Sequence, residues 1–488
     1  WQNNVFLFGS ELKALKAHPT FYGEIDRSSI VMQLRNNCIP APYSIYKGIK
    51  KLLPGTFLML SMGANGFTEK ELPKPQRYWS FAAVAENGVK NRIIKSESAT
   101  IHELDHLLSQ SVRDQMIADV PLGAFLSGGV DSSVVVALMQ KQSPVPIKTF
   151  SIGFNERGYD EAIYAKKVAS YLGTDHMELY VTAQQAMDVI HRLPRLYDEP
   201  FSDSSQIPTF LVAEMTRQHV KVALSGDGGD ELFGGYNRYF KTHQWWGKIN
   251  AIPKPIRRMI SKGLLATPPR LWDKMGYAAP GLSSDVVAKL AGVLSVEDES
   301  SLYEHFTTHW DDPASVVIGG RERFTNISDP SIELGNTVEQ MMILDGLTYL
   351  PDDILTKVDR AAMGVSLETR IPLLDHRVVE FSWKLPLNMK IRHGQGKWVL
   401  RQLLYQYVPK ELIERPKMGF GVPIDSWLRG PLKDWAESLL DESRLRREGY
   451  FYPQPIRRKW EEHLTGRRNW QSHLWGVLMF QAWLEDQH

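Results

Sequence analysis

The segment 127–133, which reads Ser-Gly-Gly-Val-Asp-Ser-Ser, combines residue types suited to binding a phosphorylated ligand. Gly128 and Gly129 can adopt dihedral angles closed to other residues, so successive backbone N–H groups can face one anion. The carboxylate of Asp131 would repel phosphate unless a divalent cation lay between them, and Mg²⁺ suits both kinds of oxygen. We therefore predict a phosphate site with magnesium here. Hydroxyl donors would come from the three serines, Ser127, Ser132 and Ser133.

Apolar runs on both sides of this loop indicate the elements that position it. Residues 120–126 are apolar enough for a buried strand, with Pro121 tolerable near its start. Residues 134–142 continue as an apolar helix, whose N-terminus favours negative charge. We expect a strand, a phosphate-binding loop and a helix that begins at the phosphates.

A second glycine-rich loop, 225–231, reads Ser-Gly-Asp-Gly-Gly-Asp-Glu and follows the apolar run 221–224. Parallel strands present their C-terminal ends at the same edge of a sheet, so the two loops can share one site. Asp131 and Asp230 are then candidates to hold Mg²⁺ on a pyrophosphate. Candidate nucleotide contacts in this loop are Ser225, Gly226 and Asp227.

Between residue 100 and the second loop, apolar strand-like runs alternate with segments of helical length. The expected strands are 120–126, 147–154, 177–181 and 221–224. Such alternation predicts an α/β fold with a parallel sheet covered by helices on both faces. Residues 240–335 read as helical fragments, and the C-terminal part from 338 onward as mostly helical.

The N-terminal part has a different pattern and predicts a separate unit. We expect a small β-containing domain over 1–80, with strands at 5–8 and 57–60, helices at 11–17 and 26–34, and a turn at 63–66. Residues 81–99 are polar with weak periodicity and are interpreted as a linker. The third region, 100–488, would be the domain that carries both glycine loops.

Composition sets limits on partners and compartment. The 57 Lys and Arg residues nearly balance the 56 Asp and Glu residues, so net charge gives no argument for a nucleic-acid partner or an anionic membrane. A single cysteine, Cys38, excludes an intramolecular disulfide framework and fits a reducing cytoplasm, where we expect Cys38 to be buried. The chain begins at Trp1 without a methionine, and we expect it to lack the first part of its fold.

Several ordered motifs carry a resemblance to a known family. Residues 127–133 look like the pyrophosphate-binding loop of ATP pyrophosphatases, and no Gly-Lys-Ser/Thr ending of a Walker-type loop is present. Segments 224–236, 349–360, 366–376 and 415–423 resemble glutamine-dependent asparagine synthetases, and residues 8–15 resemble part of that family's N-terminal glutaminase domain. The resemblance implies ATP and Mg²⁺ as cofactors and a partial Ntn-type β domain ahead of an adenine nucleotide α-hydrolase-like domain.

In that family an acid attacks the α-phosphate of ATP, and ammonia then displaces AMP. The resemblance therefore implies that aspartate or another small carboxylic acid is a substrate and that glutamine or ammonia is the nitrogen donor. The resemblance is also compatible with a homodimer. Phe125, Leu126 and Ile152 would line the adenine site, although plain sheet core explains these side chains equally well.

Three further residues are candidates for catalysis by resemblance. Lys417 stands at the position of a family lysine that stabilises charge at the adenylation centre. Lys397 is a second candidate, with a solvated helix surface as the alternative. Asp353 matches a position near the acid substrate, with a helix N-cap as the alternative. Glu368 and Arg370 are expected to form a structural ion pair at the edge of the site.

Two departures from the family pattern leave the function open. Asp227 stands where these synthetases often carry the longer Glu, which leaves the acceptor acid undecided. The family's glutaminase nucleophile is an N-terminal cysteine, and this sequence has none at its start, so we expect it to use free ammonia. The alternatives are amidation of another carboxylate, such as a uronic acid in surface polysaccharide synthesis, and a nucleotide-binding scaffold without catalysis.

Overall fold

The computed structural model describes most of the chain, with short gaps. The described residues are 1, 5–63, 66–67, 73–154, 161–267, 271–272, 284–323, 334–415 and 421–487. Two sequence predictions fall partly or wholly outside them, the centre of the 63–66 turn and the loop that carries Lys417.

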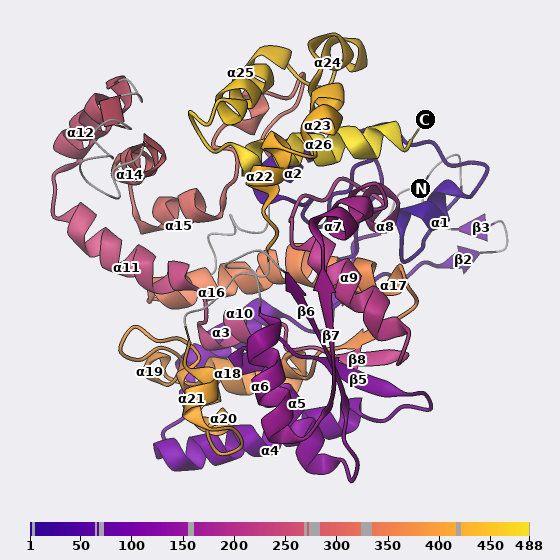
Figure 1. The fold of residues 1–488 in the computed structure, drawn as a ribbon, viewed down its shortest axis with the longest axis vertical. Coiled ribbons are helices and arrows are strands. Elements are labelled where there is room, and N and C mark those ends of the chain that lie inside the picture. The colour runs from indigo at the N-terminus through magenta and orange to yellow at the C-terminus, as the bar shows by residue number, and fades with distance from the viewer. Residues whose placement is uncertain are drawn as a thin grey trace.

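A five-stranded parallel sheet lies at the centre of the fold (Figure 1). Its order is β7-β6-β5-β8-β9, and each neighbouring pair is parallel. Strands β5, β6, β7 and β8 confirm the predicted parallel sheet. Strand β9 was not predicted, because its three residues Glu-Thr-Arg form no apolar run. The strands are β5 (Leu122–Phe125), β6 (Lys148–Phe154), β7 (Asp175–Val181), β8 (Val222–Leu224) and β9 (Glu368–Arg370).

Helices cover both faces of this sheet, as the alternation predicted. On one face, α5 (Val130–Gln142) and α6 (Ala162–Leu172) pack with Ala124 and Leu126. On the other face, α9 (Gln206–Arg217) and α17 (Thr356–Met363) pack against β6 and β9, and Phe150 and Ile152 are buried there. Alternate residues of β5 and β8 thus contribute to two different cores, which is the pattern of a sheet buried on both sides.

The remaining helices surround this layer. Figure 1 shows α22 to α26 gathered beside α2 at one end of the molecule, and α12 and α14 projecting from another corner. Within 237–335 the predicted helical fragments are α11 (Asn237–Asn250), α12 (Lys254–Ala266), α14 (Ser284–Ser295) and α15 (Glu299–Thr307). The mostly helical C-terminal part comprises α16 (Thr337–Leu347), α18 (His376–Lys384), α19 (Leu387–Lys390), α20 (Trp398–Leu404), α21 (Lys410–Ile413), α22 (Ile424–Arg429), α23 (Lys433–Leu440), α24 (Glu442–Glu448), α25 (Pro453–Leu464) and α26 (Gln471–Glu485).

Among its described residues, the N-terminal part contains two short antiparallel strand pairs and two helices. Asp26 caps α2 by accepting a hydrogen bond from the Ser28 backbone, as expected. Residues 6–8 form no strand, so that prediction is wrong, and the strand expected at 57–60 is reduced to β1. The elements are α1 (Leu12–Lys16), α2 (Arg27–Asn36), β1 (Thr56–Phe57) paired with β4 (Gln76–Arg77), and β2 (Met62–Gly63) paired with β3 (Gly66–Phe67).

The structure also adds helices in two segments where the sequence did not define them. Residues 81–90 of the expected linker form α3 (Phe81–Lys90), which packs on α18. The ring of Phe81 in α3 contacts the ring of Trp383 in α18 edge to face. The segment of helical length after the strand expected at 177–181 begins with two short helices, α7 (Ala183–Ile190) and α8 (Leu193–Tyr197), with Pro194 at the start of the second. Ahead of the sheet lies α4 (Glu97–Gln115), which buries Leu104, Leu108 and Val112.

Within the described ranges, no helix has the length and apolar character needed to cross a membrane. Cys38 is buried, as predicted, and burial raises the pKa of its thiol well above the ordinary value.

Candidate active site

A cavity of about 910 Å³ opens at the C-terminal edge of the sheet, where β5 and β8 end side by side. The chain runs from β5 outward to β7 and returns to β8 on the other side of β5, so this edge is the point where strand order reverses, a common ligand position in α/β sheets. Most predicted site residues line this cavity: Phe125, Leu126, Ser127, Gly128, Gly129, Asp131, Ser132, Ile152, Ser225, Gly226, Asp227, Asp230 and Lys397.

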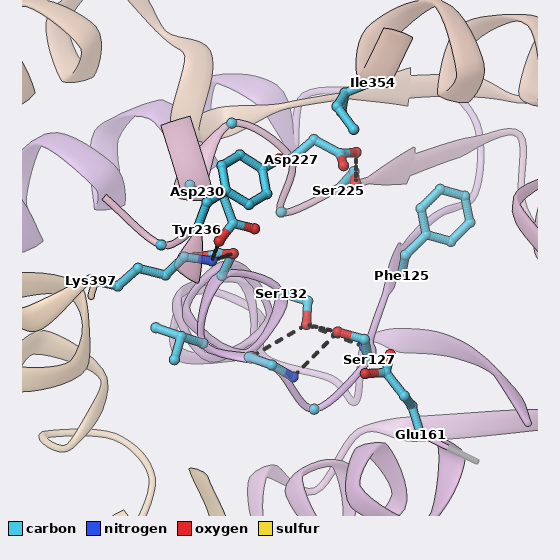
Figure 2. A pocket seen from close by; sticks show the side chains of 18 of the residues that line it. Phe125, Ser127, Ser132, Glu161, Ser225, Asp227, Asp230, Tyr236, Ile354 and Lys397 are labelled. Atoms are coloured by element: carbon cyan, nitrogen blue, oxygen red, sulfur yellow. Dashed lines mark hydrogen bonds and ion pairs between the residues drawn. The ribbon is translucent and has the colours of Figure 1, made fainter. Parts of the chain in front are cut away.

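The loop after β5 has the tight geometry that its glycines predict. Gly128 has a φ of 73°, and a Cβ there would lie 2.8 Å from the backbone nitrogen of Ala165 in α6. The Ser127 and Ser132 hydroxyls lie 3.0 Å apart, and the Gly129 N–H donates to Ser127 Oγ (Figure 2). Because α5 begins at Val130, its first-turn N–H groups are available to an anion in the cavity.

The loop after β8 packs directly against the first loop. A Cβ on Gly226 would lie 2.6 Å from the backbone nitrogen of Ser132. A Cβ on Gly229 would similarly meet the carboxylate of Asp131, with 2.5 Å to its Cγ. The sequence motifs separated by nearly 100 residues are therefore in contact at the backbone, and both glycines are needed for this approach.

The Lys397 ammonium lies between the two loops and pairs with both acidic residues. It forms an ion pair with Asp131 and lies 2.8 Å from Asp230 Oδ1 (Figure 2). Burial alone would lower the pKa of Lys397, but the two carboxylates raise it above its ordinary value. Lys397 has a φ of 59° immediately before α20, and its side chain is buried, which contradicts the solvated helix surface considered from the sequence.

The same two carboxylates fit a divalent cation. Both carboxylates pair with the Lys397 ammonium, so a divalent cation bound near this nitrogen could be shared by Asp131 and Asp230. Among the described residues, no cluster of three or more His, Cys, Asp or Glu side chains could hold a metal. Mg²⁺ at this place would take its other ligands from phosphate oxygens and water, as Mg²⁺ commonly does.

Asp227 lies beside the paired charges and is held by its own loop. The Ser225 hydroxyl donates a 2.6 Å hydrogen bond to Asp227 Oδ2 (Figure 2). Burial raises the pKa of the Asp227 carboxyl above its ordinary value, while Lys357 and Lys397 act in the opposite direction. The carboxylate therefore lies in the field of two ammonium groups.

Three predicted residues are not placed on the cavity wall. Ser133 is fully buried in α5, and Asp353 is buried behind the cavity; neither lines it. Asp353 is in a π-helical turn (η3, Leu350–Leu355) and not at a helix N-cap, so that alternative is wrong. Burial and the neighbouring Asp203 raise the pKa of Asp353 well above its ordinary value. Lys417 lies outside the described residues.

The sequence analysis missed a second ion pair in the wall. Lys357 Nζ lies 2.7 Å from Asp203 Oδ2, and both residues line the cavity. Burial opposes ionisation of Asp203, but the Lys357 ammonium holds the pKa of this carboxyl well below its usual range. The only hint in the sequence was the spacing of Asp353 and Lys357, four residues apart on one helical face.

Arg415 closes the wall near the first loop and was also missed. Its guanidinium donates a 3.2 Å hydrogen bond to the Ser127 carbonyl, pairs with Glu161 at 3.6 Å, and lies 4.3 Å from the centre of the Tyr164 ring. Arg415, the residue before the segment that carries Lys417, is thus held against the loop that follows β5. Glu368 and Arg370 form the predicted ion pair at 2.6 Å, on β9 and outside the cavity lining.

Fold and cavity together define an α/β protein with a glycine- and serine-rich loop, two converging carboxylates and a buried lysine at the carboxyl edge of its sheet. Comparison with known families gives two matches, to the asparagine synthase domain over residues 103–485 and to a glutamine amidotransferase domain over residues 1–79. The chain belongs to the asparagine synthase family, a family of carbon–nitrogen ligases.

Individual relatives cover most of the chain. It is 28% identical over 481 residues to asparagine synthetase (glutamine-hydrolysing) 1 of Bacillus subtilis, which covers 99% of this chain and 72% of that protein. Asparagine synthetase (glutamine-hydrolysing) 3 of the same organism is 26% identical over 434 residues, covering 85% and 61%. A Gibberella zeae protein named Amidase chry2 is 24% identical over 445 residues, covering 83% and 63%. Family membership supports ATP-dependent amidation in general.

Proposed function

We propose that this protein uses ATP to activate the side-chain carboxylate of aspartate and transfers ammonia to it, forming asparagine, AMP and pyrophosphate. The observation that carries the proposal is the contact between the two glycine loops with Lys397 between Asp131 and Asp230. This arrangement gathers hydroxyl and N–H donors and charged groups where a leaving pyrophosphate would collect negative charge.

The residues of the cavity support each part of this chemistry. Ser127, Ser132 and the first turn of α5 would bind the pyrophosphate, and Asp131 and Asp230 would hold Mg²⁺. When bound, Mg²⁺ supplies neutralisation of phosphate charge. Lys397 would stay protonated and keep the two carboxylates in position. Phe125, Leu126 and Ile152 line the same cavity at the strand ends, where a flat adenine ring would fit.

Asp227 would take up the proton that ammonia loses when it becomes an amide nitrogen. Its carboxyl is half-buried in the cavity wall, and desolvation raises its pKa above the ordinary value, although Lys357 and Lys397 act in the opposite direction. A base with a raised pKa holds a proton more readily near neutral pH. Lys417 and Asp353 remain proposals by resemblance, Lys417 as a stabiliser of charge at the adenylation centre and Asp353 as a group behind the acid substrate.

The test is direct: incubate the protein with aspartate, MgATP and either ammonium or glutamine, then measure AMP, pyrophosphate and asparagine. We expect the three products in equal amounts with ammonium, and less than 1% of that rate for Asp131→Ala, since loss of electrostatic stabilisation costs on the order of 100-fold or more. Formation of ADP and phosphate in place of AMP and pyrophosphate would refute the mechanism. The glutamine arm reports whether a glutaminase activity accompanies it.

Amidation of a different carboxylate is the second candidate, and the relatives named as amidases favour it. A panel of carboxylic acids that includes glucuronate, scored by pyrophosphate release, separates the two. Pyrophosphate release with a uronic acid and none with aspartate would replace the acceptor and leave the adenylation chemistry intact. No pyrophosphate with any acid, together with tight ATP binding, would indicate a scaffold without catalysis.

A further inference from the structure

The ion pair of Lys357 and Asp203 occupies a part of the cavity wall that neither glycine loop forms. Lys357 comes from α17 and Asp203 from the segment before α9, and their charged atoms are 2.7 Å apart. Buried ion pairs add little to stability, because desolvation offsets their attraction. A buried pair that faces a cavity is therefore better explained by a ligand than by the fold alone.

Both groups are held in a fixed orientation and charge state. Asp203 accepts hydrogen bonds from the Ser205 backbone N–H at 2.9 Å and from the Ser205 hydroxyl at 2.8 Å. Burial would lower the pKa of Lys357, but Asp203 and Asp353 raise it. Burial and the neighbouring Asp203 raise the pKa of Asp353, behind the pair, well above its ordinary value, which favours its uncharged form. The pair consequently presents one positive and one negative group.

The pair also has spare hydrogen-bonding capacity. Asp203 accepts hydrogen bonds from Lys357 and twice from Ser205 and has a side-chain hydrogen bond with Asp353, yet 18% of its side chain remains exposed where it lines the cavity. A lysine has three N–H donors. One goes to Asp203, and Asp353 Oδ1 lies 3.9 Å away, beyond hydrogen-bond distance. A ligand in the cavity can therefore accept from Lys357 and donate to Asp203.

The position of the pair relates it to the reacting end of the acceptor. Asp227 lies within the electrostatic influence of both Lys357 and Lys397. Lys397 marks the pyrophosphate end, where the two glycine loops meet. A small acid whose reacting carboxylate lies at that end would extend past Asp227 toward Lys357.

We propose that Lys357 and Asp203 form a subsite for the zwitterionic head group of an α-amino acid, with the lysine binding the carboxylate and the aspartate binding the ammonium. This inference rests on the proposed function, because it names the part of the acceptor that does not react. It selects an amino-acid acceptor over a uronic acid, which carries no ammonium group. Discrimination against an analogue that lacks one charge follows, because a buried polar group of the site would be left without its partner.

Two analogues of aspartate test the two contacts separately. β-Alanine lacks the α-carboxylate, and succinate lacks the ammonium group. With MgATP and ammonium, we expect kcat/KM for pyrophosphate release to be highest for aspartate. Lys357→Met should lower the aspartate value on the order of 100-fold and leave the β-alanine value within a few-fold, as expected for a lost charge-assisted hydrogen bond. Asp203→Asn should reduce the preference for aspartate over succinate in the same way.

Two further variants separate binding from folding. Lys357→Arg keeps the charge and should retain the preference for aspartate over β-alanine. Lys390→Met removes another fully buried lysine, one that does not line the cavity, and should leave all three kcat/KM values unchanged. Equal losses for aspartate and β-alanine in Lys357→Met would show a merely structural role and overturn the subsite.

A binding measurement keeps the inference testable apart from turnover. Calorimetric titration of aspartate into the protein with a non-hydrolysable ATP analogue should show binding that Lys357→Met weakens on the order of 100-fold. Binding of aspartate without pyrophosphate release would contradict the proposed function and leave the subsite standing. Absence of aspartate binding, or pyrophosphate release with acids that lack an amino group and none with aspartate, would overturn the subsite and leave ATP-dependent amidation standing.

Discussion

The Lys397 ammonium lies 2.8 Å from Asp230 Oδ1, and the same ammonium pairs with Asp131 on the neighbouring loop. One buried cation thus links the ends of two strands, β5 and β8, whose loops would otherwise bring like charges together. The two carboxylates in turn raise the pKa of the Lys397 ammonium above its ordinary value, although burial acts in the opposite direction.

Replacing this cation should weaken both the fold and the chemistry. Lys397→Met leaves two carboxylates without their counter-ion, and breaking a buried pair costs about 3–5 kcal/mol. We expect a lower melting temperature, which Mg²⁺ raises more in the variant than in the wild type, because the ion takes the place of the ammonium. Thermal unfolding with and without Mg²⁺ measures this.

The exposed lysine Lys47, which pairs with Glu24 at the surface, provides the control. Lys47→Met removes the same charge and should shift the melting temperature little, since exposed pairs contribute about 0–1 kcal/mol. Equal responses of the two variants to Mg²⁺ would contradict the assignment of the Lys397 position to a cation site.

The contact between the glycine loops makes Gly226 intolerant of a side chain. In Gly226→Ala the new Cβ would lie 2.6 Å from the Ser132 backbone nitrogen, so the loops must separate. We expect at least a 10-fold loss of ATP affinity, measured by calorimetry, with most of the helical circular dichroism retained.

A glycine with open surroundings is the matched control. Gly247 lies in α11, and a Cβ there meets nothing within 4 Å. Gly247→Ala should raise stability by about 0.5–1 kcal/mol through helix propensity and leave ATP affinity unchanged. Similar ATP affinities in Gly226→Ala and wild type would mean that the loops are not packed as described.

The buried Lys390 should make stability depend on pH. Burial lowers the pKa of this ammonium to about 7, and its nitrogen lies 4.4 Å from the centre of the Trp383 ring. Between about pH 7 and the unfolded pKa of 10.5, the unfolded chain binds a proton that the folded chain does not. Stability contributed by this group therefore rises with pH across that window and is lost as pH falls through about 7.

Removing the titrating group tests this prediction. The gain in melting temperature of Lys390→Met over the wild type should be larger at pH 7 than at pH 9, because the wild type is less penalised at the higher pH. A gain that is the same at both values would show that Lys390 does not titrate in this range.

The two residues of the Glu368–Arg370 pair should contribute unequally to the free energy of unfolding. Glu368 is exposed, so Glu368→Gln should change the free energy of unfolding by less than about 1 kcal/mol. Arg370 also donates to the carbonyls of Gln115 and Ile117, each at 2.7 Å. Arg370→Met should cost about 1–3 kcal/mol, since two carbonyls lose their donor. Urea unfolding measures both, and equal losses would contradict the role assigned to the arginine.

Much of the central fold was predictable, because the local pattern of apolar residues indicates its strands and helices. The four apolar strands and the helices between them follow from burial on both faces of a parallel sheet. The N-terminal strands were poorly predicted, since two-residue strands such as Thr56–Phe57 leave almost no periodicity. Strand β9 was not predicted because Glu368, Thr369 and Arg370 are polar. Their backbone joins the sheet by pairing with β8.

The sequence by itself determined the tight glycine- and serine-rich loop and its acidic neighbour, because glycine, serine and aspartate at fixed spacing allow few backbone arrangements. It also determined that both loops follow strands and so reach one edge of the sheet. Only the tertiary structure decided that Lys397 is buried between them, that Asp353 lies behind the cavity, and that Lys357 meets Asp203 in its wall. The physical reason is that side-chain burial and charge pairing depend on segments 150 to 270 residues apart, whose approach no local pattern records.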